Sequence, residues 1–555
     1  MLRLSRIGTA FSFALILSLT ACGPDQGTTA PSETTQEDLD RQREEARQKA
    51  MAAGLIGQAR TDIQAGNYIS ARKRAEEAIA ANPKDADAYG VLGAAYWRAG
   101  EYELSTKAFR EGLALDPGSF PVAIGLARNL QAGGLHEEAI LLSDALIALE
   151  SKDFNAVACQ PASSSAQGEE AGGKEEEEES EEEEEDEEDS CEMGWCNPDT
   201  NMCTPNRQVS PRLQKLWSQY LLMDVESGLE SANELFIGAV GGDEAQGQIN
   251  IAASYRDFLQ AFAGQKDLIS IVGEEGSSSL GLDTAQGLKY TGAVVGGEFA
   301  STVIQELQNE TRINKALADT LKLKVLAKIK PITSAEEMAV VLIPEIKIGE
   351  LTIKNVPALV DDLSMYSSIG EVPGLSLGRQ VLHRLGSISF DFAGRSMVVT
   401  KSVPGTVEGA HENPLLFMDT FYSTVPVTSV SLDGSDRRFW TWFGGIYPAG
   451  IGVTQKEFLK SGKHRPSELE NPEDADRGLK MVYVDQLSLG DFSVSGVGGL
   501  VFISNPPDAG LESVTSGVGF ELGGYVNFSV IQKWKVTYVL QQGKIYIQAP
   551  AVTEG

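Results

Sequence analysis

A spacing of 34 residues near the N-terminus constrains the fold of this chain more than any other feature. Four sets of positions follow it within an Ala-rich segment. They are Gly66, Gly100 and Gly134; Tyr68, Tyr102 and His136; Pro83 and Pro117; and Ala59, Gly93 and Ala127. Such a period is typical of stacked helix pairs, in which each repeat covers the apolar face of its neighbour and small residues allow close packing. The sequence predicts a solenoid of three helical repeats within residues 45–150.

The middle repeat resembles the tetratricopeptide pattern. The matching positions are Leu92-Gly93, Tyr96, Phe109 and Pro117. The resemblance implies a scaffold or a peptide-binding surface that supplies no catalytic group, so the expected partner is a peptide or protein ligand.

The first 22 residues have the form of an export signal. Arg3 and Arg6 precede an apolar core from Ile7 to Leu19, which is too short for a stable transmembrane helix. The next residues, Leu19-Thr20-Ala21-Cys22, resemble the bacterial lipobox, which implies that Cys22 carries lipid and anchors the protein to a membrane. Residue 23 is Gly rather than Asp, which in such lipoproteins implies the outer membrane of the cell envelope. An ordinary secretory signal is the alternative, and residues 23–44 are predicted to be a flexible tether.

The segment 151–207 carries much of the negative charge. The chain has a formal net charge of −33, which argues against binding of nucleic acid, and the run 169–189 contains 16 acidic residues and one Lys. Like charges at this density extend and solvate a chain, so the run predicts a disordered low-complexity linker.

Four cysteines remain after Cys22, namely Cys159, Cys191, Cys196 and Cys203. An even number in an exported protein predicts two disulfides, and three pairings are open. The stretch 191–203 contains no His, which makes a zinc site the weaker interpretation. No metal or other cofactor is expected.

Residues 208–264 are predicted to be a helical connector. Two sets of apolar residues follow the spacing of a single helix face. They are Leu213, Leu216, Trp217 and Tyr220, and Tyr255, Phe258, Leu259 and Phe262.

Beyond residue 264 the sequence changes to short alternating strands separated by Gly, Asp and Ser. Residues 265–402 and 422–550 can be aligned as two copies of one mostly β lobe. The matched stretches are 268–272 with 427–431, 279–286 with 438–445, 345–351 with 486–492, 374–378 with 519–523, and 388–399 with 534–547. A helix-like Glu298-Phe299-Ala300 follows Asp283 by 15 residues, as Glu457-Phe458-Leu459 follows Trp442.

This order of features resembles the retropepsin-like aspartic peptidases, arranged in tandem as in a two-lobed peptidase. In that family a strand ends in Asp-Thr/Ser-Gly, and a later apolar-apolar-Gly strand lies beside it. The resemblance implies that Asp283 is the catalytic acid of the first lobe and that Thr284 braces it, with Ala285 in place of Gly. Leu377-Gly378 and Leu522-Gly523 take the place of the later strand.

The second lobe departs from the family pattern. Trp442, Phe443 and Gly444 stand where the second triplet is expected, and an indole cannot share a proton with a carboxylate as the catalytic dyad requires. An alternative alignment of the first lobe places Tyr290-Thr291-Gly292 on the triplet and loses the acid there as well.

The sequence therefore predicts a multidomain, membrane-anchored binding protein. A tetratricopeptide scaffold precedes an acidic linker and a two-lobed module whose catalytic triplet is degenerate. The alternatives are an active aspartic endopeptidase, in which two copies of Asp283 meet in a homodimer, and a purely structural envelope protein.

Overall fold

The computed structural model describes residues 36–149 and 209–548, except 242, 284–286, 332–333, 335, 420–423, 436–437, 443–449, 461, 465–478 and 503–521. It also describes short strands at 157–158, 193–197 and 202–205. The chain separates into two compact units, residues 1–50 and 51–555, and the second contains the β lobes. Among the described helices, none has both the length and the hydropathy to cross a bilayer. The predicted lipid site at Cys22 lies outside the described residues.

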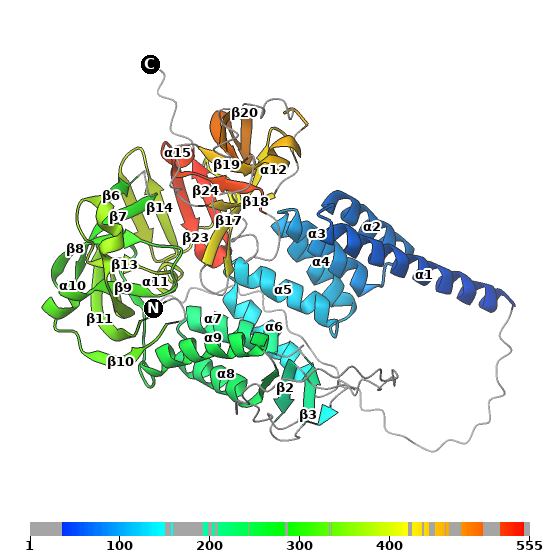
Figure 1. Cartoon of the computed structure of the whole chain (residues 1–555), viewed down its shortest axis with the longest axis horizontal. Helices are drawn as coiled ribbons and strands as arrows, with labels where there is room; N and C mark the ends of the chain where they lie inside the picture. The colour runs from blue at the N-terminus through cyan, green and yellow to red at the C-terminus, as the bar shows by residue number, and fades with distance from the viewer. Residues whose placement is uncertain are drawn as a thin grey trace, which may run out of the picture. The chain divides into compact units, whose positions relative to one another are not determined.

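The N-terminal region is a run of helix pairs, as the 34-residue period predicts (Figure 1). The first helix begins at Gln36, within the segment predicted to be a flexible tether. The helix bounds are α1 Gln36–Gln64, α2 Tyr68–Ala81, α3 Ala86–Arg98, α4 Tyr102–Leu115, α5 Phe120–Ala132 and α6 His136–Leu149.

The periodic glycines end the first helix of each repeat. Gly66, Gly100 and Gly134 have φ angles of +75°, +80° and +74°, in the left-handed region where glycine avoids a Cβ clash. The N–H of each following residue donates a hydrogen bond five residues back, at 2.8 Å, 2.9 Å and 2.8 Å. This is the Schellman arrangement, so the glycine period is a repeated helix stop.

Small residues allow the helices of the repeats to approach closely. A Cβ on Gly93 would lie 2.9 Å from the ring of Phe109, a distance that packed carbon atoms do not adopt. Ala59 and Ala127, one period before and after, are fully buried. The predicted role of this fourth phase is confirmed.

Three helices form the described part of the connector. They are α7 Val209–Leu221, α8 Val225–Gly238 and α9 Asp243–Gln260. The two predicted apolar faces pack on each other, because the ring of Tyr220 stacks on Tyr255 at 4.2 Å and meets Phe258 edge-on at 5.6 Å.

Lobe 1 is a β structure that runs from residue 270 to residue 400 (Figure 1). Its strands are β5 Ser270–Val272, β6 Glu275–Asp283, β7 Leu288–Val295, β8 Glu298–Ile304, β9 Thr311–Asn314, β10 Val325–Ile329, β11 Met338–Ile348, β12 Leu351–Asp361, β13 Leu375–Leu377, β14 Ser387–Asp391 and β15 Ser396–Thr400. Its helical turns are α10 Lys315–Thr320, η2 Leu363–Ile369 and α11 Arg379–Leu382.

Lobe 2 runs from residue 411 to residue 548, so it begins before the predicted boundary at 422. Its strands are β16 His411–Asp419, β17 Thr424–Leu432, β18 Arg438–Trp442, β19 Ile451–Thr454, β20 Leu479–Leu489, β21 Phe492–Phe502, β22 Gly524–Val526, β23 Lys535–Val539 and β24 Lys544–Gln548. Its helical turns are α12 Gln455–Lys460, α15 Phe528–Ile531 and η4 Leu540–Gln542.

The pairing of strands shows that the lobes are two copies of one topology. In lobe 1, β13 runs parallel to β8 and antiparallel to β9, while β12 runs parallel to β9. In lobe 2, β22 has the same relation to β18 and β19, and β21 runs parallel to β19. The predicted hairpins at 345–351 and 486–492 are equivalent, each with a left-handed Gly at its turn.

A shared antiparallel sheet joins the lobes in the order β6–β15–β14–β23–β24–β16. The order is symmetric about the β14–β23 pair. On one side lie β14, β15 and β6 of lobe 1, and on the other lie their equivalents in lobe 2, β23, β24 and β16. Ser389 and Thr537 are equivalent residues that face each other at the centre of this pair, with their hydroxyls 2.8 Å apart. The match of 396–399 with 544–547 is therefore confirmed, whereas 388–392 corresponds to 536–540 and not to 534–538, a shift of two residues.

Three other parts of the predicted alignment are wrong. The strand at 427–431 belongs to β17, which corresponds to β7 and not to the strand at 268–272. The stretch equivalent to 374–378 is 523–527 and not 519–523, because Gly374 and Gly523 donate the equivalent hydrogen bonds to Ser301 and Phe439. Residues 298–300 begin strand β8 rather than a helix, since β-branched Thr302, Val303 and Ile304 continue an extended run.

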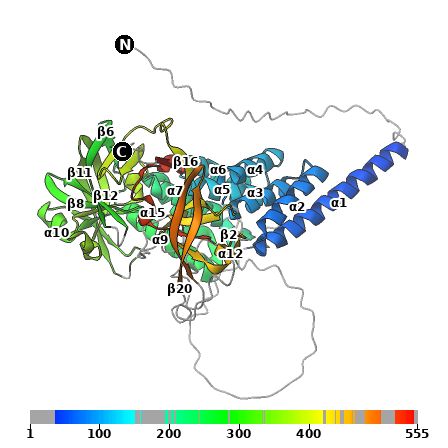
Figure 2. The same ribbon diagram turned by 90° about the horizontal axis from the view of Figure 1, so that it is seen from above.

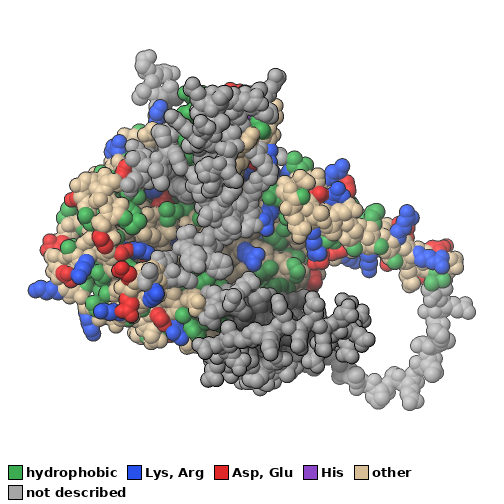
Figure 3. All heavy atoms as spheres, viewed as in Figure 1, with side chains coloured by type: hydrophobic (Ala, Val, Ile, Leu, Met, Phe, Trp, Pro, Cys, Tyr) green, Lys and Arg blue, Asp and Glu red, His purple; other side chains and the backbone are tan. Residues whose placement is uncertain are grey.

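Acidic and basic side chains are interspersed over lobe 1 on the face shown in Figure 3. This mixture gives the face no single-sign field, whereas the run at 169–189 is almost purely acidic.

Candidate functional site

The family pattern places the catalytic triplet after the strand that lies beside the later apolar-apolar-Gly strand. In lobe 1 that later strand is β13, which precedes Gly378, and its parallel neighbour is β8. Strand β8 ends at Ile304, so the triplet positions are Gln305-Glu306-Leu307. No aspartate occupies them.

The equivalent strand of lobe 2 is β18, the parallel neighbour of β22. It ends at Trp442, and Phe443-Gly444 follows in the sequence, outside the described residues. Trp442 pairs with Val526 as Ile304 pairs with Leu377, so Trp442 corresponds to Ile304. The predicted pairing of Trp442 with Asp283 is therefore wrong.

Asp283 instead lies at the end of β6, half-buried and opposite Leu288 in the β6–β7 hairpin. Strand β16 of lobe 2 is equivalent to β6. Ser278 of β6 pairs with Met397, and Asn413 of β16 pairs with the equivalent residue, Ile545. Five residues further along each strand, Met418 is therefore the equivalent of Asp283. Thr284 and Ala285 lie outside the described residues. The alternative triplet at 290–292 is in the middle of β7, between β6 and β8, and is not a strand end.

The two equivalent strand ends do meet through side chains at the lobe interface. Trp442 Nε1 donates a hydrogen bond of 2.9 Å to the hydroxyl of Tyr538 in β23. That hydroxyl lies 3.5 Å from Glu306 Oε1, which also accepts a hydrogen bond of 2.6 Å from Lys289 Nζ in β7. We call these four residues the lobe-interface network.

The lobe-interface network is sealed from solvent. Trp442, Tyr538, Glu306 and Lys289 are 2%, 2%, 5% and 7% exposed. Burial, and then the charge of Glu306, raise the pKa of Tyr538 well above its ordinary value, so the phenol keeps its proton at neutral pH. The lysine compensates the carboxylate, and the arrangement has neither a paired acid nor access for water. It fits a structural role.

Gln305, at the first triplet position, is also held by polar contacts. Its Nε2 lies 3.3 Å from the hydroxyl of Tyr366, which receives a second hydrogen bond of 2.8 Å from Gln308. An amide cannot act as the general base that activates water in this family. The described part of lobe 1 therefore carries no catalytic acid at this position.

Lobe 2 occupies the edge that a second copy of lobe 1 would need. Strand β14 pairs over four residues with β23 of the same chain, about a local two-fold relation. A homodimer that joined two first lobes in this way would have to displace lobe 2 and expose the paired edge. The structure therefore offers no support for a dimeric dyad.

The helical repeats dock on the β module through Trp97 and through the periodic residues Tyr68 and His136. Trp97, at the end of α3, packs edge-on against Phe439 of β18 at 5.3 Å. The ring of Tyr68 lies under the guanidinium of Arg438 at 4.5 Å, and the ring of His136 contacts His383 of lobe 1 at 4.9 Å. Helix α5 also contacts β16 (Figure 2).

The residues of the second phase, Tyr68, Tyr102 and His136, thus begin α2, α4 and α6 on the edge that meets the β module. Tyr102 shares one apolar cluster with Leu416 and Phe439 of lobe 2. The glycine phase lies along the same edge, because a Cβ on Gly134 would be 2.0 Å from the carbonyl oxygen of Leu540. The sequence showed the period but contained no signal that this edge is an internal interface.

The predicted cysteines are only partly described. Strands β2 Met193–Asn197 and β3 Met202–Pro205 form an antiparallel hairpin in which Cys196 is the backbone partner of Cys203. Cys22, Cys159 and Cys191 lie outside the described residues. Among the described residues, no cluster of His, Cys, Asp and Glu is arranged to hold a metal ion.

Comparison with known proteins identifies the class of the repeat region. A tetratricopeptide repeat family model matches residues 56–120. The superkiller protein 3 of Schizosaccharomyces pombe is 32% identical over 92 residues, which cover 17% of this chain and 7% of that protein. The helical region is thus a tetratricopeptide scaffold of the kind used in protein–protein interaction.

Solved structures resemble both parts of the chain. A retropepsin-like aspartic protease from Rickettsia conorii is 19% identical and covers 24% of this chain and 94% of its own, with a TM-score of 0.17. The first tetratricopeptide domain of RPAP3 (Spaghetti), bound to an HSP90 peptide, is 18% identical and covers 19% and 86%, with a TM-score of 0.18.

The sequence missed the triplet positions at Gln305 and Glu306. A signal was present, because strand β9 and its helix α10, capped by the Asn314 side chain, follow β8 in lobe 1 as β19 and α12 follow β18 in lobe 2. Because these strand–helix units are equivalent, the strands that precede them, β8 and β18, are equivalent as well. The Asp-Thr pair at 283–284 pointed to an earlier strand instead.

Proposed function

We propose that this protein is an envelope lipoprotein that binds a protein partner through its helical repeats. The β module serves as a rigid, catalytically inactive support for them. One observation carries the proposal: the two strand ends that would form an aspartic dyad end instead in the buried lobe-interface network. Among the described residues, the repeats then remain as the surface best suited to bind a protein partner.

A basic pair on the repeats indicates the chemistry of the partner. Arg98 of α3 and Arg128 of α5 are cations on neighbouring helices. Burial lowers the pKa of Arg98, Tyr68 partly opposes this effect, and Arg128 lowers the pKa further. Two such cations favour an acidic segment as a ligand. We infer that the partner presents an acidic peptide to α3 and α5.

A capture experiment tests this function. The immobilised protein is incubated with an envelope extract, and captured proteins are quantified by mass spectrometry. The double variant Arg98→Gln/Arg128→Gln is expected to lose the partner. The control Lys73→Gln/Lys107→Gln removes the same charge from exposed positions on α2 and α4 and is expected to retain it. Equal capture by both double variants would contradict the proposed surface.

A second assay addresses peptidase activity. The purified protein is incubated with an unfolded substrate at acidic pH, and we expect no cleavage by the wild type or by Asp283→Asn. Cleavage by the wild type that disappears in Asp283→Asn would restore the peptidase hypothesis. Membrane anchoring is tested separately, since Cys22→Ser is expected to move the protein out of the membrane fraction.

A further inference from the structure

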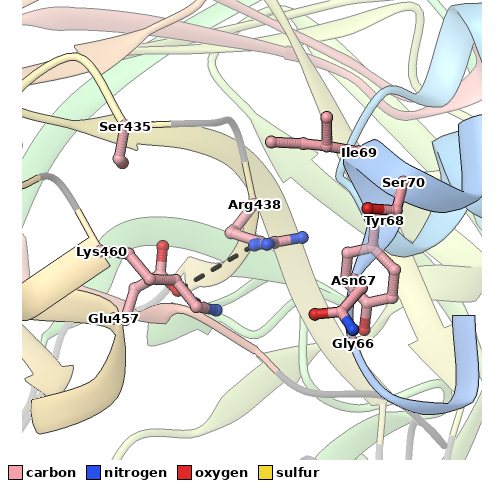
Figure 4. Close-up of a pocket in the computed structure, with 9 residues that line it drawn as sticks. All are labelled: Gly66, Asn67, Tyr68, Ile69, Ser70, Ser435, Arg438, Glu457 and Lys460. Carbon is pink, nitrogen blue, oxygen red and sulfur yellow. Dashed lines mark hydrogen bonds and ion pairs between the residues drawn. The ribbon is translucent and has the colours of Figure 1, made fainter. Parts of the chain in front are cut away.

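A cavity of about 330 Å³ lies between the first turn of the repeats and lobe 2 (Figure 4). Asn67 and Tyr68 line it from the start of α2. Arg438 of β18 and Glu457 and Lys460 of α12 line it from lobe 2. The cavity is thus built from two parts of the chain more than 350 residues apart in sequence.

Arg438 is the central group of this cavity. The residue is 7% exposed, and its guanidinium lies over the ring of Tyr68, 4.5 Å from the centroid. Among the described residues, none accepts a hydrogen bond from the buried Nη1. A guanidinium carries five donors, and a buried charged donor without an acceptor is costly. The guanidinium is therefore incompletely satisfied, and an acceptor in the cavity that Arg438 lines would bind it.

Glu457 does not fill this role. Its Oε2 lies 4.0 Å from Arg438 Nε, beyond hydrogen-bond length, and 2.9 Å from Lys460 Nζ. Figure 4 shows the guanidinium between this carboxylate and the Tyr68 ring. The single negative charge of Glu457 balances only one of the two positive charges of Arg438 and Lys460. Among the described residues that line the cavity, one positive charge is therefore left without a counter-charge.

We propose that this cavity binds a carboxylate, with Arg438 as the anchoring residue. The planar guanidinium matches a carboxylate through two parallel hydrogen bonds. A carboxylate carries a single negative charge, which equals the uncompensated charge of the cavity. A phosphate monoester carries about −1.5 to −2 at neutral pH and would leave an excess.

The cavity has room for a small acid or the end of a peptide. At about 30 Å³ per water molecule, the volume equals that of about eleven waters. A free acid of four or five carbons, or the terminal residue of a chain, fits within this volume. The bound molecule would contact both the repeats and lobe 2, so it would stabilise their docking.

Binding is measured by isothermal titration calorimetry on the full chain with four probes. Butyrate, which has a single carboxylate, represents a free acid, and an acetylated alanine tripeptide with a free C-terminus represents a peptide end. The same tripeptide with a C-terminal amide and inorganic phosphate complete the set. Heat from butyrate alone identifies a free acid as the ligand. Heat from the tripeptide acid but not from its amide identifies a chain terminus.

Three variants test the site itself. Arg438→Gln is expected to weaken binding about tenfold or more, the loss typical of a charge-assisted hydrogen bond. Lys460→Gln leaves the stacked arginine in place and releases the negative charge of Glu457, so it is expected to weaken binding about three- to tenfold. The matched control Lys463→Gln removes a charge three residues away, outside the cavity, and is expected to change binding less than about twofold.

The proposal goes beyond partner binding and does not depend on it, because the probes are small molecules and the partner surface is on α3 and α5. It is overturned if neither carboxylate binds at about 10 mM, a concentration that detects even weak specific sites. Tighter binding of phosphate than of either carboxylate would also overturn it. So would unchanged binding in both Arg438→Gln and Lys460→Gln.

Discussion

Replacing Gly134 by Ala should separate the helical repeats from the β module. Gly134 has φ +74°, and an added Cβ would lie 2.0 Å from the carbonyl oxygen of Leu540 and 3.2 Å from His383 Cε1. The backbone oxygen of Leu540 cannot rotate away as a side chain would. The variant must therefore shift the whole turn or undock it from lobe 2.

Gly264 provides a matched control because its backbone is the same and its surroundings are open. Its φ is +76°, and an added Cβ would meet nothing within 4 Å. Gly264→Ala should cost only the left-handed strain of about 1–2 kcal/mol. Gly134→Ala adds overpacking against the carbonyl, about 1–3 kcal/mol, so the total is about 2–5 kcal/mol.

The assay combines urea unfolding with small-angle scattering. Because the protein has several parts, the repeats of Gly134→Ala should unfold at a lower urea concentration than the rest of the chain. The radius of gyration should rise at urea concentrations below that transition, because the repeats undock before they unfold. Gly264→Ala should keep the wild-type radius. If both variants lose the same stability and neither changes the radius, then the periodic glycines do not set the docking.

Other predictions concern buried charge and the cysteines. Lys289→Met strands a buried carboxylate and should lower the free energy of unfolding by about 3–5 kcal/mol, whereas Lys347→Met, from a partly exposed pair, should change it by less than about 1 kcal/mol in the same urea assay. Burial, with two nearby arginines, lowers the pKa of His383 from 6.5 to about 3, so the unfolded chain binds the proton first and stability should fall as pH drops below 6.5; His383→Phe should reduce this slope, and an unchanged slope would contradict it. Cys196 and Cys203 are cross-strand partners, so peptide mapping of the unreduced protein should find them joined, and a bond from either to another cysteine would be the opposing result.

The sequence predicted elements whose determinants are local. The helix stops at Gly66, Gly100 and Gly134 follow from glycine's freedom at positive φ, and the hairpin at Gly349 has the same cause. The apolar faces of α7 and α9 follow from helical periodicity, which the Tyr220–Tyr255 stack confirms.

The alignment of the two lobes was only partly predictable. The hairpin at 345–351 matched correctly because its turn leaves a visible mark in the sequence, and in the hairpin at 388–399 the second strand matched while the first was shifted by two residues. The match of the Asp283 stretch with the Trp442 stretch was wrong, since short alternating strands resemble one another and their order along the chain does not reveal their neighbours.

By itself, then, the sequence determined the repeat class, the duplicated β character of the C-terminal half and the residue types available for chemistry. Only the tertiary structure decided which strand ends meet, because parallel pairing of β8 with β13 and of β18 with β22 joins residues over 70 positions apart. It also decided that the periodic edge of the repeats packs against lobe 2 and encloses Arg438. Long-range contacts of this kind depend on complementary surfaces, and no local pattern encodes them.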